Sequence, residues 1–176
     1  MEIKFPYADI LYFFNPMKLS PAKKGLITAA LMIALFLAIY YSGKDADVRI
    51  QYLVYIIYAM GITWTVIAYR QSSAFTGKFN DIFSQGFKCF IVVTLLIALF
   101  YGIFNYQHPE FAEETAKAYK EQLIIEKQKL PMEIESEMAT YKKQYTLKLV
   151  SGAIFGYLII GAAVTAAASA LLIRRK

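Results

Sequence analysis

Residues 89–107 have the sequence CFIVVTLLIALFYGIFNYQ, in which no acidic, basic or histidine side chain occurs. Crossing about 30 Å of hydrocarbon takes roughly 20 helical residues, and this stretch is about that long. Lys88 precedes it and His108 follows it, so polar groups stand at both ends. The sequence therefore predicts a membrane-spanning helix here, at about residues 87–106.

Three further apolar stretches lie at about residues 25–41, 50–69 and 147–173, and Lys148 near the start of the last is their one charged residue. Lys23 and Lys24 precede the first of them, and a basic tail, residues 174–176, follows the last. A signal peptide is the alternative for the first stretch, but no small-residue cleavage site follows Tyr40 and Tyr41, which favours a retained span. We predict an all-α, integral membrane four-helix bundle, with residues 1–176 forming a single membrane domain.

The composition of the 176-residue chain agrees with a membrane protein. Hydrophobic residues make up 58% and charged residues 18%, against about 45–50% and about 25% in soluble domains. Cys89 is the only cysteine, which excludes a disulfide framework and a cysteine-based metal site. The net charge of +6 gathers at the ends of the apolar stretches, so we expect no nucleic acid as a partner.

The distribution of lysine and arginine predicts the orientation in the membrane. With four spans both termini lie on one side, and that side carries ten basic residues against three acidic ones. The opposite side carries nine basic and ten acidic residues. Because short cytoplasmic loops are enriched in lysine and arginine, we expect both termini in the cytoplasm of a bacterial cell, in the inner membrane.

Two segments lie outside the predicted spans. Residues 1–20 are rich in aromatic side chains and are interrupted by prolines, so we expect them to lie in the membrane interface. Residues 107–146 carry two helical patterns separated by Pro131, which predicts a periplasmic helical hairpin whose second helix continues to about residue 173. Its apolar face, which either packs on itself or docks a partner, consists of Tyr119, Leu123, Ile134, Met138, Tyr141 and Tyr145.

Three motifs resemble a bacterial membrane-protein family, the domain of unknown function 4199. The sequence FSQGFK at residues 83–88 leads into the third span, NYQHPEF at residues 105–111 leads out of it, and the Gly/Ala-rich last span ends in a basic tail. The resemblance covers about residues 20–176 and is strongest from residue 80. It implies a small protein with four transmembrane helices and no established activity, accompanying envelope enzymes of the glycosyltransferase type.

The search for catalytic chemistry finds little. His108 is the only histidine, and it stands beside Pro109 and the acidic residues Glu110, Glu113 and Glu114. We interpret this group as an interfacial turn and a helix start, where acidic side chains complement the helix dipole. No zinc spacing or phosphate-binding glycine loop occurs. We expect no catalytic residues, no metal, no cofactor and no enzyme activity.

The last span carries small residues at helical spacing. Gly152 and Gly156 form one pair, and Gly161 and Thr165 lie on a second strip. Small residues let helices approach closely in a membrane. Internal packing of the bundle is the favoured interpretation of these residues, and contact with another subunit is the alternative.

Together these features predict a non-enzymatic accessory or scaffold subunit that docks a partner in the cell envelope. Besides the lipid bilayer, its partner would be another membrane protein or a second copy of the chain. The alternative is a small pore or carrier for an uncharged or lipid-like solute. A coupled transporter is disfavoured, because apart from Lys88 and Lys148 at their ends the predicted spans hold no acidic, basic or histidine side chain of the kind that ion pathways use.

Overall fold

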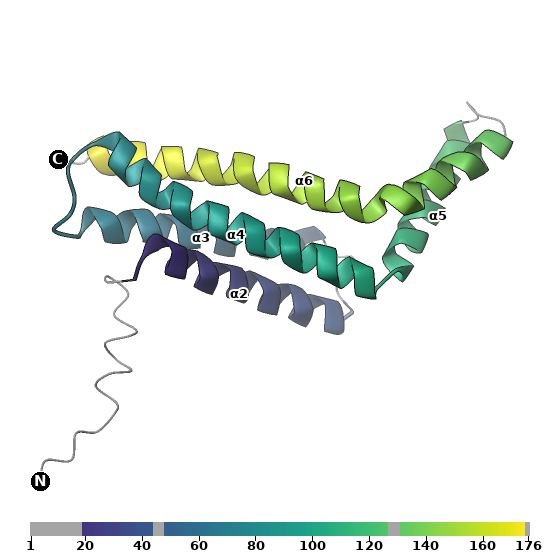
Figure 1. Ribbon diagram of the computed structural model, residues 1–176, viewed down its shortest axis with the longest axis horizontal. Helices are drawn as coiled ribbons and strands as arrows, with labels where there is room; N and C mark the ends of the chain where they lie inside the picture. The colour runs from purple at the N-terminus through teal and green to yellow at the C-terminus, as the bar shows by residue number, and fades with distance from the viewer. Residues whose placement is uncertain (1–18, 44–47, 127–130, 175–176) are drawn as a thin grey trace, which may run out of the picture. The chain divides into compact units, whose positions relative to one another are not determined.

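The computed structural model describes residues 19–43, 48–126 and 131–174. The predicted interfacial segment, residues 1–20, therefore lies outside the described residues except at its end. The described chain is helical, as predicted, and contains no strand (Figure 1). Its helices are α2 (Pro21–Tyr41), α3 (Val48–Arg70), α4 (Phe79–Gln107), α5 (Glu110–Glu126) and α6 (Pro131–Arg174).

Four of these helices are long and apolar enough to cross a membrane: α2, α3 from Tyr52 onward, α4 and α6 from Met132 onward. α5 and the beginning of α6 form the helical hairpin that was predicted between the third and fourth spans. The chain is therefore a multi-pass membrane protein with an all-α fold.

The ends of α2 follow from local chemistry. The hydroxyl of Ser20 accepts a hydrogen bond from the backbone N–H of Lys23, and Pro21 occupies the first helical position, where a missing N–H does no harm. At the other end Gly43 has φ +67°, a left-handed conformation that glycine adopts without strain. Its N–H donates to the carbonyl of Tyr40, which satisfies one of the last carbonyls of the helix.

Two helices extend beyond the hydrocarbon lengths predicted for them. α6 has 44 residues without interruption, which confirms the prediction of one helix from about residue 132 to 173. α4 begins at Phe79, eight residues before the predicted span. The added residues are partly polar, and a helix that extends beyond the hydrocarbon can contain such residues. Along this extension Phe79 stacks on Phe83 and Phe83 on Phe87, with ring centroids 5.8 and 6.5 Å apart.

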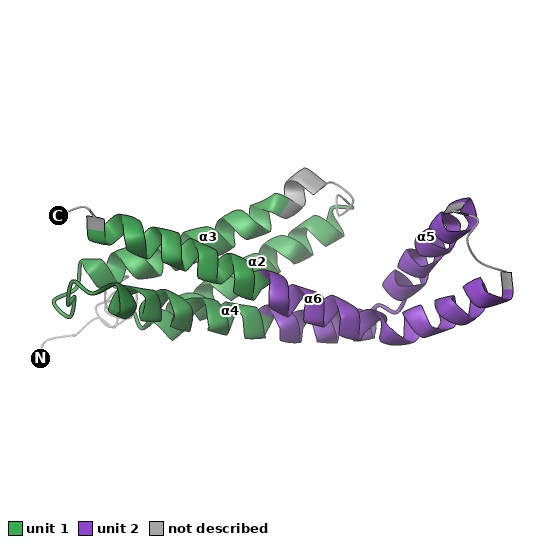
Figure 2. Cartoon of the chain, turned by 90° about the horizontal axis from the view of Figure 1, so that it is seen from above, with its two compact units in different colours: residues 1–96, 157–176 green, residues 97–156 purple. Residues whose placement is uncertain are grey.

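The chain divides into two compact units (Figure 2). Unit 1 comprises residues 1–96 and 157–176, and unit 2 comprises residues 97–156. Each unit has its own interior.

In unit 1, glycines set the close approach of the helices. A Cβ added at Gly61 of α3 would collide with Thr28 of α2, and one at Gly25 of α2 would lie 2.7 Å from the carbonyl oxygen of Cys89 in α4. Small residues at such crossings let backbones meet, because association within lipid depends on close packing. The interior between the helices is filled by the fully buried side chains of Tyr58, Ile62, Val66, Phe90 and Val93.

Unit 2 contains the hairpin, defined here as α5 with residues 131–146 of α6. The chain turns between α4 and α5 at His108 and Pro109, where the N–H of Phe111 donates to the carbonyl of His108. Pro109 lacks a donor and disfavours helical geometry in the residue before it, so α4 ends there.

Candidate functional site

The predicted apolar face of the hairpin lies between its two helices. Leu123 of α5 and Ile134 and Met138 of α6 are buried together with Ala116. The rings of Tyr119 and Tyr141 stack on this cluster with centroids 5.1 Å apart. These side chains therefore hold α5 against α6.

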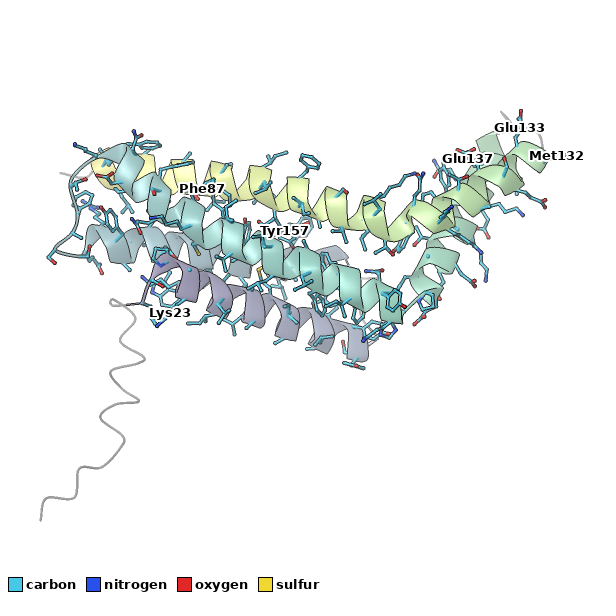
Figure 3. All side chains as sticks on the ribbon, in the orientation of Figure 1. Lys23, Phe87, Met132, Glu133, Glu137 and Tyr157 are labelled. Atoms are coloured by element: carbon cyan, nitrogen blue, oxygen red, sulfur yellow. The ribbon has the colours of Figure 1, made fainter. Side chains whose placement is uncertain are left out.

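A polar contact supports the same packing of the hairpin. The hydroxyl of Tyr119 in α5 donates to the carboxylate of Glu137 in α6 over 3.3 Å. Within α6, the ammonium of Lys148 lies 5.3 Å from the centre of the Tyr141 ring. Figure 3 labels Glu137 on the first part of α6. Tyr145 continues the aromatic row, with its ring centroid 6.3 Å from that of Tyr141.

Apolar side chains also remain on the outside of the hairpin. Ile125 near the end of α5 is 78% exposed, and Met132 at the start of α6 is 83% exposed. Ile124 is exposed as well. Both ends of the helix pair next to residues 127–130 thus present apolar side chains that no described residue covers.

The two strips of small residues on α6 have different surroundings. Gly161 and Thr165 are buried in unit 1, where a Cβ at Gly161 would lie 2.7 Å from Cγ of Phe90. Thr165 packs against Gly86 of α4, and its hydroxyl donates to the carbonyl of Gly161 over 2.6 Å. This strip is part of the interior of unit 1.

Gly152 and Gly156 lie on an open part of α6. No atom would come within 4 Å of a Cβ added at either glycine. Neighbouring side chains on that side are the large apolar Phe155 and Ile159, 66% and 68% exposed. We call Gly152 and Gly156 the outer strip of α6.

A buried charge in unit 1 escaped the sequence reasoning. Lys24 was assigned to the flank of the first span, yet α2 begins at Pro21 and the Lys24 side chain is only 3% exposed. A signal was present in the sequence, since Lys24 and Thr28 are four residues apart and share a helix face with Gly25. That face is the buried one.

The side chains of His108 and Glu110 are in contact at the turn between α4 and α5. Nδ1 of His108 lies 2.7 Å from Oε1 of Glu110, and the His108 ring packs against Phe104 with centroids 4.5 Å apart. Among the residues that the structure describes, no group of three or more histidine, cysteine or acidic side chains is placed to hold a metal ion. The pair occupies the first turn of α5, where a carboxylate is favourable.

The backbone N–H of Glu110, and then the His108 ring, hold the pKa of the Glu110 carboxyl below its ordinary value of 4.5. The stabilisation of this turn is complete above pH 4.5 and is lost as the pH falls through the lower folded pKa. Replacing His108 by alanine is expected to raise the pKa of Glu110 only part of the way, because the backbone contact remains. The ¹³C shift of the Glu110 carboxyl, followed from pH 6 to 2, measures it; an unchanged midpoint would contradict the role of the ring.

Comparison with known proteins identifies the family of this chain. A family model described as protein of unknown function (DUF4199) matches residues 23–175 of the chain. No curated protein and no solved structure matches it. The match includes all four helices that can cross a membrane, the hairpin and the outer strip of α6. The chain therefore belongs to the DUF4199 family of membrane proteins.

Proposed function

We propose that this protein is a non-enzymatic accessory or scaffold subunit that docks another membrane protein along the outer strip of α6. The observation that carries the proposal is the open surroundings of Gly152 and Gly156, where an added Cβ would meet nothing. Two glycines four residues apart at an unpacked helix face leave room for the backbone of a second helix. The partner class, an envelope enzyme of the glycosyltransferase type, follows from the resemblance alone.

The contrast between the two strips of α6 supports docking over internal packing. The space beside Gly161 is filled by Phe90 and Tyr58 within unit 1, whereas a Cβ added at Gly152 would meet no atom within 4 Å. A glycine in a helix interior is less favourable than alanine by about 1 kcal/mol. Because no side chain of the same chain occupies the space beside Gly152 and Gly156, contact with a helix of another protein explains why two glycines stand here.

The proposal includes a location and an orientation. We place the protein in a bacterial inner membrane with both termini in the cytoplasm and the hairpin in the periplasm. The excess of lysine and arginine on the side of the termini supports this orientation. The exposed Ile125 and Met132 then offer a second apolar contact to the periplasmic part of a partner.

The alternative, a pore or carrier, receives less support from unit 1. Large side chains that are fully buried, Tyr58, Ile62 and Phe90, occupy the space between its helices. A path for a solute would require these side chains to move apart. Docking requires no change in the described interior.

Replacing both Gly152 and Gly156 by leucine is expected to abolish recovery of the partner while the protein remains folded. Leucine side chains at the outer strip would keep the second helix away, while their Cβ atoms would meet nothing within 4 Å in their own chain. The measurement is affinity purification from native membranes in mild detergent, with mass spectrometry of the recovered proteins and the melting temperature of the variant.

A matched control replaces Ala30, an exposed small residue of α2, by leucine. This variant places a leucine on another outward face and is expected to retain the partner. Recovery of the wild-type protein alone and monomeric would overturn the docking proposal. Recovery of a stable partner of a different enzyme class would overturn the glycosyltransferase assignment and leave docking in place.

A further inference from the structure

Lys24 is a lysine in the interior of a membrane bundle. Its side chain is 3% exposed, whereas the neighbouring Lys23 on α2 and Lys88 on α4 are exposed. Figure 3 shows Lys23 at the beginning of α2. Lys24 lies three residues after Pro21, about 5 Å along the helix axis, so its ammonium lies near the end of the bundle and not at its middle.

The surroundings of the ammonium are aromatic and apolar. Its nitrogen lies 5.4 Å from the centre of the half-buried Trp64 ring in α3. Gly25, the next residue of α2, packs against the backbone of Cys89 in α4. Three helices thus meet beside Lys24, and all of these residues belong to unit 1.

No carboxylate in the described part of unit 1 balances this charge. Asp81 is the one acidic residue there, and it accepts a hydrogen bond from the hydroxyl of Thr76. In the described part of the chain no ion pair joins Asp81 to Lys24.

The free-energy cost of burying the Lys24 ammonium favours the binding of an external anion. A cation over an aromatic ring gains about 2 kcal/mol when water is excluded. Removing an ammonium from water costs several kcal/mol, which a ring alone does not repay. In membrane proteins such buried charges are retained where they bind something.

The electrostatics of this end of unit 1 select the chemistry of the anion. Besides Lys24, the described chain places Lys23, Arg70 and Lys78 at or next to the same ends of α2, α3 and α4, against Asp81 alone. A phosphate group suits such a basic surface, and lysine binds phosphate as a point charge. Anionic lipids bring phosphate to the depth at which α2 begins.

We propose that Lys24, backed by Trp64, forms the base of a phosphate-binding site at the basic end of unit 1. The phosphate belongs to an anionic lipid headgroup or to a free phosphate compound, and both would make the same contact with the ammonium. The site is independent of the outer strip of α6, since none of its residues belongs to that strip. Loss of partner docking would therefore leave it unaffected.

The chain contains its own reporter for this site, because Trp64 is its single tryptophan. The experiment follows Trp64 fluorescence of the full-length protein in detergent while short-chain phosphatidylglycerol, short-chain phosphatidylcholine or inorganic phosphate is added. Phosphatidylglycerol is expected to change the emission saturably, and phosphatidylcholine to bind at least tenfold more weakly because its headgroup carries no net charge. A saturable response to inorganic phosphate alone would assign the site to a free phosphate compound.

Lys24→Gln tests the residue, and Lys88→Gln is the matched control that removes an exposed lysine within α4. Loss of one charge-assisted contact weakens binding by about tenfold or more, so we expect that loss for Lys24→Gln and less than twofold for Lys88→Gln. Lys24→Arg, which keeps the charge, is expected to retain the response if the glutamine variant does not fold. A wild-type protein that responds to neither probe, or equal affinity in wild type and a folded Lys24→Gln, would overturn the proposal.

Discussion

Replacing Gly161 by valine is expected to lower the melting temperature of the protein by roughly 10 °C. A Cβ at this position would collide with the hydroxyl of Tyr58 and would lie 2.7 Å from Cγ of Phe90, both of them buried rings. Forcing extra atoms into a packed interior costs about 3 kcal/mol, and in a protein of this size each kcal/mol lowers the melting temperature by about 2–4 °C. Thermal size-exclusion profiles of the detergent-solubilised protein measure the shift.

Gly152→Val is the matched control on the same helix. It makes the same chemical change, but the added side chain meets no atom within 4 Å of its Cβ. Its melting temperature is expected to stay within about 3 °C of the wild type, since valine and glycine differ by less than 1 kcal/mol in helix propensity. If the two variants melted at the same temperature, the buried position of Gly161 would be wrong.

Replacing Tyr58 by alanine is expected to destabilise the protein by about 3–5 kcal/mol, as is usual for a buried aromatic side chain. Tyr58 is fully buried, and its ring meets that of Tyr157 edge-on with centroids 5.2 Å apart. Its hydroxyl donates a hydrogen bond to the carbonyl of Tyr157 over 2.8 Å, joining α3 to α6. Unfolding in a denaturant series, followed by Trp64 fluorescence, measures the free energy.

Two further variants separate the contributions of Tyr58. Tyr58→Phe removes only the hydroxyl and is expected to cost about 1 kcal/mol. Tyr52→Ala, at an exposed position of the same helix, is expected to cost less than 1 kcal/mol. In the double variant with Gly161→Val the two losses are expected to be less than additive, because alanine removes the hydroxyl with which the valine collides. Strict additivity would contradict the contact between these positions.

The membrane spans could be predicted because hydrocarbon tolerates few charged side chains, and the four apolar stretches satisfy that requirement without any knowledge of packing. The beginning of α4 at Phe79 could not be predicted in this way, since the extension contains Asp81 and a helix outside the hydrocarbon can carry charged side chains. The hairpin followed from periodicity, as the spacing from Ile134 to Met138 to Tyr141 places these side chains on one face. Its orientation across the membrane stays a prediction.

The environment of the small residues could not be obtained from α6 alone. Gly152 and Gly156 have the same spacing as Gly161 and Thr165, so local sequence does not distinguish them. What separates the two strips is Phe90 of α4, which packs against Gly161 from about seventy residues away. Lys24 was missed for a related reason: a lysine near a helix start usually reaches water, and only the packing of α3 and α4 against α2 encloses it.

The single sulfhydryl of Cys89 lies in the interior of unit 1 with no accessible surface, 3.9 Å from the carbonyl oxygen of Gly61. Water-soluble maleimides do not reach such a group in the folded state. Cys89 therefore need not be replaced before labelling of introduced cysteines. Single cysteines introduced at Ser42 and Ser72 would show on which side of the membrane of an intact cell each connection between helices is accessible.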